Sequence, residues 1–209
     1  MKYGFIPKLM WAGYKGTFKK ELSVTLHESD PSKVMKNAHK KYKEILSGVD
    51  EFEKGDRFLI NIVSCAMLSS ILLSVENKYL LEEVRLYYRN AMCENFLTKA
   101  ASKKSKAYTE KGRAKLKEQA KMSEIIDNPY SWKFTVEDGE TLNQYTAYFH
   151  TCGICYLMTK LGLAEYIPAM CRLDYDMAEL NNTVFTREYT IAGGGKYCDC
   201  HYDHKGKTK

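Results

Sequence analysis

An uncharged stretch of 18 residues, Phe58 to Val75, constrains the fold of this chain most strongly. Its length is the lower limit for a helix that spans a bilayer. Asn61 and several serines dilute its hydropathy, however, and no aromatic belt flanks it as in a typical membrane span. We therefore predict a buried central helix, against which the rest of the chain packs, instead of a membrane helix.

The segments around this stretch carry signals of further helices. The pair Asp30-Pro31 begins a helix, with an N-cap followed by a proline at the first helical position, and Gly48 ends it. A second helix should begin near Asp56 and contain the apolar stretch. Apolar side chains at mixed spacings of three and four predict a third helix over residues 76–101, and a lysine-rich helix should then run up to Asn128-Pro129.

The pattern changes to strands after residue 130. Residues 132–136 alternate apolar and polar side chains, and Asp138-Gly139 predicts a hairpin turn before a return strand over 142–149. The remaining segments should form two helices and a second hairpin, over residues 152–161, 164–180, 183–191 and 196–202.

Grouped helices and hairpins, without alternating β–α–β units, predict an α+β fold. We expect a helical N-terminal half packed on an antiparallel four-stranded sheet made of the two hairpins. The chain should form a single domain over residues 1–209, with a mainly helical part over 1–130 and a hairpin-helix-helix-hairpin part over 131–204.

Charge and cysteine content narrow the class of protein. The net charge is +6, and positive charge is concentrated in residues 103–121. We interpret this segment as a solvated helix face and not as a nucleic-acid interface, because only Tyr108 interleaves its lysines and no nucleic-acid motif is present. Seven cysteines, an odd number, argue against a disulfide scaffold, and the N-terminus lacks the apolar core of a secretory signal. We therefore expect reduced thiols and a cytoplasmic location.

Most of the cysteines lie close together in the last third of the chain. Cys152-Gly-Ile-Cys155 and Cys198-Asp199-Cys200 could jointly supply four thiolates to a zinc ion or an iron–sulfur cluster, although the second pair has C-x-C spacing. On a strand, Cys198 and Cys200 would point to one face and Asp199 to the other.

Two further motifs offer candidate site residues. Cys171 and Asp174 are three apart on a predicted helix and would share a face, so that a thiol and a carboxylate enter one pocket. The alternative is a structural cysteine beside a surface aspartate. Arg187 can bind a carboxylate through two parallel hydrogen bonds, and the glycine turn around Gly194 either brings backbone N–H groups to an anion or simply closes a hairpin.

The order and spacing of these motifs resemble one family, the L-2-amino-thiazoline-4-carboxylic acid hydrolases. The resemblance covers about residues 143–202, and the chain departs from the family pattern at Thr151, where arginine is frequent, and at Cys200, where an aromatic residue is frequent. It depends on Cys152 to Gly162, Cys171-Arg172-Leu173-Asp174, Thr186-Arg187-Glu188-Tyr189-Thr190, Gly194 and Cys198-Asp199.

The resemblance implies a bacterial hydrolase that opens a cyclic isothiourea at the carbon between sulfur and nitrogen, giving N-carbamoyl-cysteine. Asp174 and Asp199 would hold the amidine-like nitrogens and move protons. A thiolate would attack the carbon, with Cys198 favoured because it lies beside Asp199. The implied catalytic residues are Cys152, Cys171, Asp174, Cys198 and Asp199, and the implied substrate-binding residues are Arg172, Arg187, Thr190 and Gly194.

We expect a small-molecule substrate and no nucleic acid, membrane or cofactor, with zinc-bound hydroxide as an alternative mechanism and a homo-oligomer left open. The alternative from another class is a sensor module that binds a small molecule or a metal without chemistry. A hyper-reactive thiol without bound metal would indicate the hydrolase, and bound metal without a reactive thiol would indicate the sensor.

Overall fold

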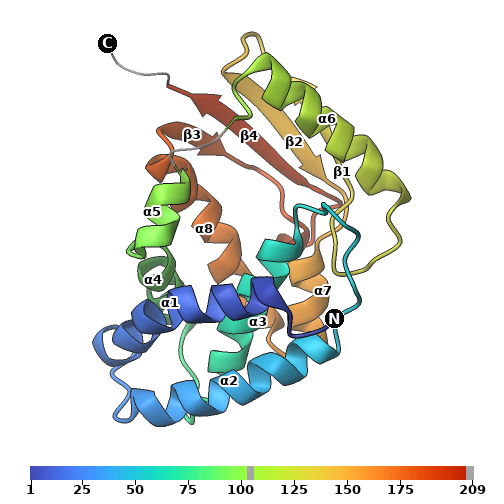
Figure 1. Cartoon of the computed structure of the whole chain (residues 1–209). Coiled ribbons are helices and arrows are strands. Elements are labelled where there is room, and N and C mark those ends of the chain that lie inside the picture. The colour runs from blue at the N-terminus through green and yellow to red at the C-terminus, as the bar shows by residue number, and fades with distance from the viewer. Residues whose placement is uncertain (103–105, 206–209) are drawn as a thin grey trace.

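The computed structural model describes residues 1–102 and 106–205. Helices occupy most of the described chain before residue 126, and strands appear only after it (Figure 1). The helices before the first strand are α1 Phe5–Val24, α2 Pro31–Ser47, α3 Leu59–Leu72, α4 Leu81–Cys93, α5 Phe96–Ser102 and α6 Glu110–Ile125. The later elements are β1 Phe134–Asp138, β2 Gln144–Phe149, α7 Gly153–Lys160, η1 Ala164–Tyr166, α8 Ile167–Leu180, β3 Thr183–Thr186, η2 Ile191–Gly193 and β4 Cys198–His204.

The strands form one antiparallel sheet in the order β1-β2-β4-β3. Each hairpin pairs its own strands, and the two hairpins join where β2 runs beside β4, with Ala147 opposite Cys200. Because side chains alternate along a strand, Cys198 and Cys200 share one face of the sheet while Asp199 points to the other. The α+β fold with a four-stranded antiparallel sheet is confirmed.

Two helices cover the edges of one sheet face. Helix α6 packs on β1, and its Arg113 guanidinium lies 4.5 Å from the ring centre of Tyr145. Helix α8 packs on β3, where the rings of Tyr175 and Phe185 are 4.8 Å apart. Tyr145 and Phe185 both lie opposite Tyr202 in the sheet register, so the two helices cover the same face. Between them the central strands β2 and β4 face the interior of the molecule (Figure 1).

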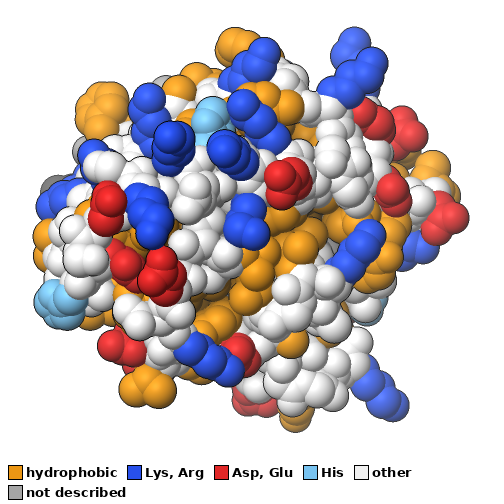
Figure 2. All heavy atoms as spheres, turned by 90° about the horizontal axis from the view of Figure 1, so that it is seen from below, with side chains coloured by type: hydrophobic (Ala, Val, Ile, Leu, Met, Phe, Trp, Pro, Cys, Tyr) orange, Lys and Arg blue, Asp and Glu red, His pale blue; other side chains and the backbone are white. Residues whose placement is uncertain are grey.

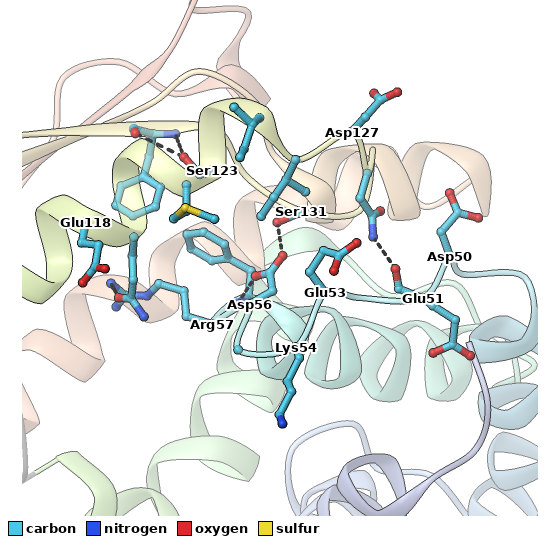
Figure 3. A pocket seen from close by; sticks show the side chains of 18 of the residues that line it. Asp50, Glu51, Glu53, Lys54, Asp56, Arg57, Glu118, Ser123, Asp127 and Ser131 are labelled. Atoms are coloured by element: carbon cyan, nitrogen blue, oxygen red, sulfur yellow. Dashed lines mark hydrogen bonds between the residues drawn. The ribbon is translucent and has the colours of Figure 1, made fainter.

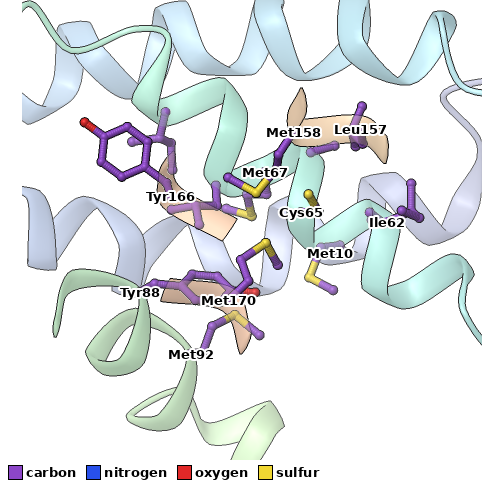
Figure 4. Close-up of a cluster of buried hydrophobic side chains, with 14 of the residues drawn as sticks. Met10, Ile62, Cys65, Met67, Tyr88, Met92, Leu157, Met158, Tyr166 and Met170 are labelled. Atoms are coloured by element: carbon purple, nitrogen blue, oxygen red, sulfur yellow. The ribbon is translucent and has the colours of Figure 1, made fainter. Parts of the chain in front are cut away.

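The apolar stretch forms the buried central helix α3. Residues 62–71 of this helix are all buried, and α2 and α7 pack against it. The serine hydroxyl groups of this helix form hydrogen bonds within the protein; for example, the Ser64 hydroxyl lies 2.8 Å from that of Tyr88. Figure 4 shows Cys65 and Met67 of α3 gathered with Met158 of α7 and other apolar side chains in the core. In the described part of the chain no helix is long and apolar enough to cross a membrane.

Several predicted boundaries are confirmed and two are wrong. Helix α2 begins and ends as predicted, and the Asp30 carboxylate accepts a hydrogen bond from the Lys33 N–H at 2.9 Å. The predicted helix over 76–101 is two helices, because the Asn95 side chain accepts from the Leu97 N–H and begins α5. The third strand ends at Thr186 and not near 191, because the Asp199 carboxylate takes the next N–H groups out of the sheet.

Charged side chains are distributed over much of the surface. Figure 2 shows a face on which Lys and Arg side chains are scattered among Asp and Glu, with hydrophobic side chains in the hollow between them. Along α6, Lys111, Lys115 and Lys121 are exposed, as a solvated helix face requires, whereas Arg113 is buried. Lys103 and Lys104 of the predicted basic segment lie outside the described residues.

Candidate active site

A cavity of about 440 Å³ lies over the central strands, between α6 and α8, and we call it the thiol cavity. It brings together candidate residues from distant parts of the sequence. The strand alternation described above directs Cys198 and Cys200 into it, and the first turns of α3 and α7 contribute further walls. The sequence-predicted residues that line it are Cys152, Cys171, Asp174, Arg187 and Cys198.

Cys152 occupies the N-cap of α7, where helix N–H groups have no partner within the helix. Its sulfur accepts a hydrogen bond from the Cys155 backbone N–H at 3.4 Å. A hydrogen bond from the Cys155 thiol, helped by the backbone N–H groups of Ile154 and Cys155, lowers the pKa of the Cys152 thiol despite its burial. The same interaction and burial raise the pKa of Cys155. The pair therefore contains one thiol that ionises readily and one that stays protonated.

The other thiols in the thiol cavity are held neutral. Burial raises the pKa of Cys171 to about 12 and that of Cys200 to about 12. Burial also raises the pKa of Cys198, although its sulfur accepts a hydrogen bond from the Ile191 N–H at 3.3 Å. Because the thiolate is the nucleophilic form, these directions favour Cys152 over Cys198 as the reactive thiol.

Asp174 and Arg187 form an ion pair at the wall of the thiol cavity. The Arg187 Nη1 donates to Asp174 Oδ2 at 2.9 Å, and its Nη2 donates to the Cys171 carbonyl at 2.9 Å. The arginine side chain is only 5% exposed, whereas that of Asp174 is 49% exposed, with its accessible surface toward the cavity. Because the Asp174 carboxyl is exposed to the enclosed cavity and not to open solvent, desolvation raises its pKa, and the Arg187 charge opposes this shift. Arg187 thus holds Asp174 through Nη1, while its buried Nε has no hydrogen-bond partner among the described residues.

The remaining sequence-predicted residues lie outside the thiol cavity. Asp199 is on the opposite sheet face, where it accepts from the N–H groups of Glu188 and Tyr189 at 3.3 and 2.6 Å. The Thr190 hydroxyl accepts from the Gly193 N–H at 2.9 Å and caps η2. Gly194 adopts φ +87°, a left-handed conformation that is strained for residues with a side chain. The exposed Arg172 lies over the Tyr175 ring. Asp199, Thr190 and Gly194 thus shape the loop that carries Arg187.

Sequence reasoning missed several polar side chains of the thiol cavity, among them Arg57 and Asn61. Arg57 forms no ion pair within the described residues, and its guanidinium makes a long hydrogen bond of 3.4 Å to Gln119. The Asn61 side chain has no hydrogen-bond partner in the described chain. Neither residue belongs to a recognisable motif. Arg57 directly precedes the uncharged stretch and Asn61 lies within it, and we interpreted that stretch only as core.

A second cavity of about 620 Å³ lies between the loop before α3 and α6. Figure 3 shows Glu51, Glu53 and Asp56 around it, with Arg57 extending toward α6. Asp56 is already engaged, accepting from the Ser131 hydroxyl at 2.6 Å and from the Phe58 N–H at 2.8 Å. No cysteine is among the described residues that line this cavity, so the candidate nucleophiles all belong to the thiol cavity.

The cysteines do not cluster as metal ligands do. Across residues 1–102 and 106–205, no group of three or more His, Cys, Asp or Glu side chains is arranged to hold a metal ion. Cys152, Cys198 and Cys200 instead line the thiol cavity, and the Cys155 thiol hydrogen-bonds to Cys152.

The model of one protein family matches residues 61–202, which is more than half of the chain. That family is described as L-2-amino-thiazoline-4-carboxylic acid hydrolase. The chain belongs to this family. No curated protein and no solved structure matches it.

Family membership supports a hydrolase-like function for the chain. The matched residues of this L-2-amino-thiazoline-4-carboxylic acid hydrolase family member include every sequence-predicted residue of the thiol cavity, from Cys152 to Cys198. They begin at Asn61, so that Arg57, Phe58 and Ile60, which also line the cavity, precede the matched segment.

Proposed function

We propose that this protein is a cysteine hydrolase that opens a cyclic isothiourea bearing a carboxylate, such as L-2-amino-thiazoline-4-carboxylic acid. One observation carries the proposal: Cys152, with a lowered thiol pKa, lines the same cavity as the Asp174 carboxyl. Family membership supports the substrate class.

The thiolate of Cys152 begins the reaction by attacking the ring carbon between sulfur and nitrogen. The carbon–sulfur bond of the ring then breaks, and the ring sulfur leaves with a proton from Asp174. This step leaves an isothiourea attached to Cys152 and a free thiol on the substrate. The raised pKa of Asp174 supports its role as the proton donor, because a carboxyl that is protonated more readily can act as a general acid.

Water completes the reaction by attacking the same carbon, with the Asp174 carboxylate accepting a proton. The bond to the Cys152 sulfur breaks, the thiolate is regenerated, and N-carbamoyl-cysteine is released. One water molecule is consumed, and Asp174 returns to its starting protonation state. The two steps thus use one nucleophile and one acid–base group.

Binding roles follow from which cations are already engaged. We assign the substrate carboxylate to Arg57, because this residue lines the thiol cavity and has no ion-pair partner among the described residues. Arg187 is a positioning residue that orients Asp174. Asp199, Thr190 and Gly194 hold the loop of Arg187, and Arg172 is not among the residues that line the cavity.

Thiol release from L-2-amino-thiazoline-4-carboxylic acid tests the proposal directly. We expect wild-type turnover and a loss of at least about 1,000-fold in kcat for Cys152→Ser, because a hydroxyl at that position is not ionised at neutral pH. Cys93→Ser, a buried cysteine outside the thiol cavity, should retain activity within about 2-fold.

Three results would change the assignment. Loss of activity in Cys198→Ser with retention in Cys152→Ser would make Cys198 the nucleophile. Stoichiometric zinc by elemental analysis, with activity abolished by a chelator, would replace the thiolate mechanism by zinc-bound hydroxide. Binding without turnover in the wild type would favour the non-catalytic sensor module.

A further inference from the structure

A third hollow, distinct from the two cavities described above and about 580 Å³ in volume, adjoins the thiol cavity on the side of the helices. We call it the helical groove. Its walls come from α1, α3, α4, α5 and α8, and from the first turn of α7. It shares five lining residues with the thiol cavity, namely Ile60, Asn61, Ile154, Met170 and Asp174. A ligand in the thiol cavity can therefore extend past Asp174 into the groove.

The helical groove presents apolar surface to a ligand. Its hydroxyl groups are paired with one another, since Ser64 bonds to Tyr88 at 2.8 Å and Tyr14 bonds to Thr98 at 2.9 Å. Methionines make up much of the remaining wall, and Figure 4 shows Met10, Met92 and Met170 close to Tyr88. Flexible thioether side chains adapt to apolar groups of varied shape.

The rim of the helical groove carries apolar side chains that solvent reaches. Leu9 of α1 is 55% exposed, Ile60 of α3 is 49% exposed and Leu97 of α5 is 42% exposed. Covering such side chains is favourable in proportion to the apolar area removed from water. The wall from α1 precedes residues 61–202, so the groove is completed by a segment outside the family match.

We propose that the substrate carries an apolar chain on its exocyclic nitrogen and that this chain occupies the helical groove. The orientation rests on the proposed function. Of these two hollows, Arg57 lines only the thiol cavity and would hold the carboxylate, whereas Asp174 lines both and would hold the amidine end. A substituent on the nitrogen beside Asp174 therefore points toward the groove. The substrate class is a 2-(alkylamino)-thiazoline-4-carboxylate, and its hydrolysis gives an N-(alkylcarbamoyl)cysteine.

Calorimetric titration with two guanidinium probes tests the groove without any turnover. Each probe offers Asp174 the same amidine-like head, and only the tail differs. We expect N-octylguanidinium to bind the wild type at least about 30-fold tighter than methylguanidinium, since each buried methylene contributes roughly 4-fold. In Leu9→Lys this preference should fall at least about 5-fold. In Val24→Lys, on the same helix, equally exposed and outside the groove, the preference should persist.

The kinetic counterpart compares the octylamino and unsubstituted thiazolines, and kcat/KM should favour the octylamino compound. Equal affinities for the two guanidinium probes, or equal effects of Leu9→Lys and Val24→Lys, would overturn the groove assignment. The assignment would also be overturned if the wild type sediments as a dimer that Leu9→Lys dissociates and shows no preference for the octyl probe, because the groove would then be an interface between copies. Octyl preference without thiazoline hydrolysis would refute only the proposed function, and hydrolysis without octyl preference would refute only the groove.

Discussion

At the scale of single residues, the Cys155 thiol controls the ionisation of Cys152. Its hydrogen bond lowers the pKa of Cys152, so the thiolate is present at lower pH than for an ordinary cysteine. In Cys155→Ala this donor is lost and the pKa of Cys152 should rise, which moves the curve of alkylation rate against pH to higher pH. Iodoacetamide labelling of the Cys152 peptide measures the midpoint, with Cys93→Ala as the control. An unmoved midpoint would show that the helix N-terminus acts alone.

At the scale of elements, Gly153 fixes where α7 begins. A Cβ at this position would lie 2.0 Å from the Tyr130 carbonyl oxygen, so only glycine lets the first turn approach that backbone. We expect Gly153→Ala to lower the free energy of unfolding by about 1–3 kcal/mol and to slow alkylation of Cys152. Gly16→Ala, in α1 with open space around it, should instead stabilise the protein by about 0.5–1 kcal/mol. Urea unfolding compares the two, and equal stabilities would contradict the close approach.

At the scale of the whole molecule, Arg113 fastens α6 to the sheet and so closes one side of the thiol cavity. Its guanidinium donates to Asp138 at 2.8 Å and to the Gln144 and Leu142 carbonyls at 3.0 Å each. Arg113→Ala should cost about 2–4 kcal/mol of unfolding free energy and raise KM for the thiazoline. Lys117→Ala, which removes an exposed partner of the same Asp138, should cost below about 1 kcal/mol. Thermal unfolding and kinetics measure both, and similar losses would mean that α6 is held by apolar packing.

The sequence alone determined the features that depend on near neighbours. The uncharged stretch predicted the buried helix α3, because a long segment without charged side chains is favoured in the protein interior. The caps at Asp30 and Gly48 predicted α2, because a cap is a contact between residues a few positions apart. Alternation along β4 already placed Cys198 and Cys200 on one face. The family resemblance also came from motif order and spacing, and the family match agrees with it.

Only the tertiary structure decided which of these groups share a solvent-accessible space and how each one ionises. The sequence predicted that Arg187 binds a carboxylate, and only the fold shows that Asp174 of the same chain lies 2.9 Å from its guanidinium. Arg57 belonged to no motif, yet the fold places it among the residues that line the thiol cavity. The sequence favoured Cys198 because it is adjacent to Asp199, whereas the surroundings in the fold lower the pKa of Cys152 and raise that of Cys198. Cavity walls and pKa values depend on atoms from segments far apart in the chain, and local spacing does not encode that arrangement.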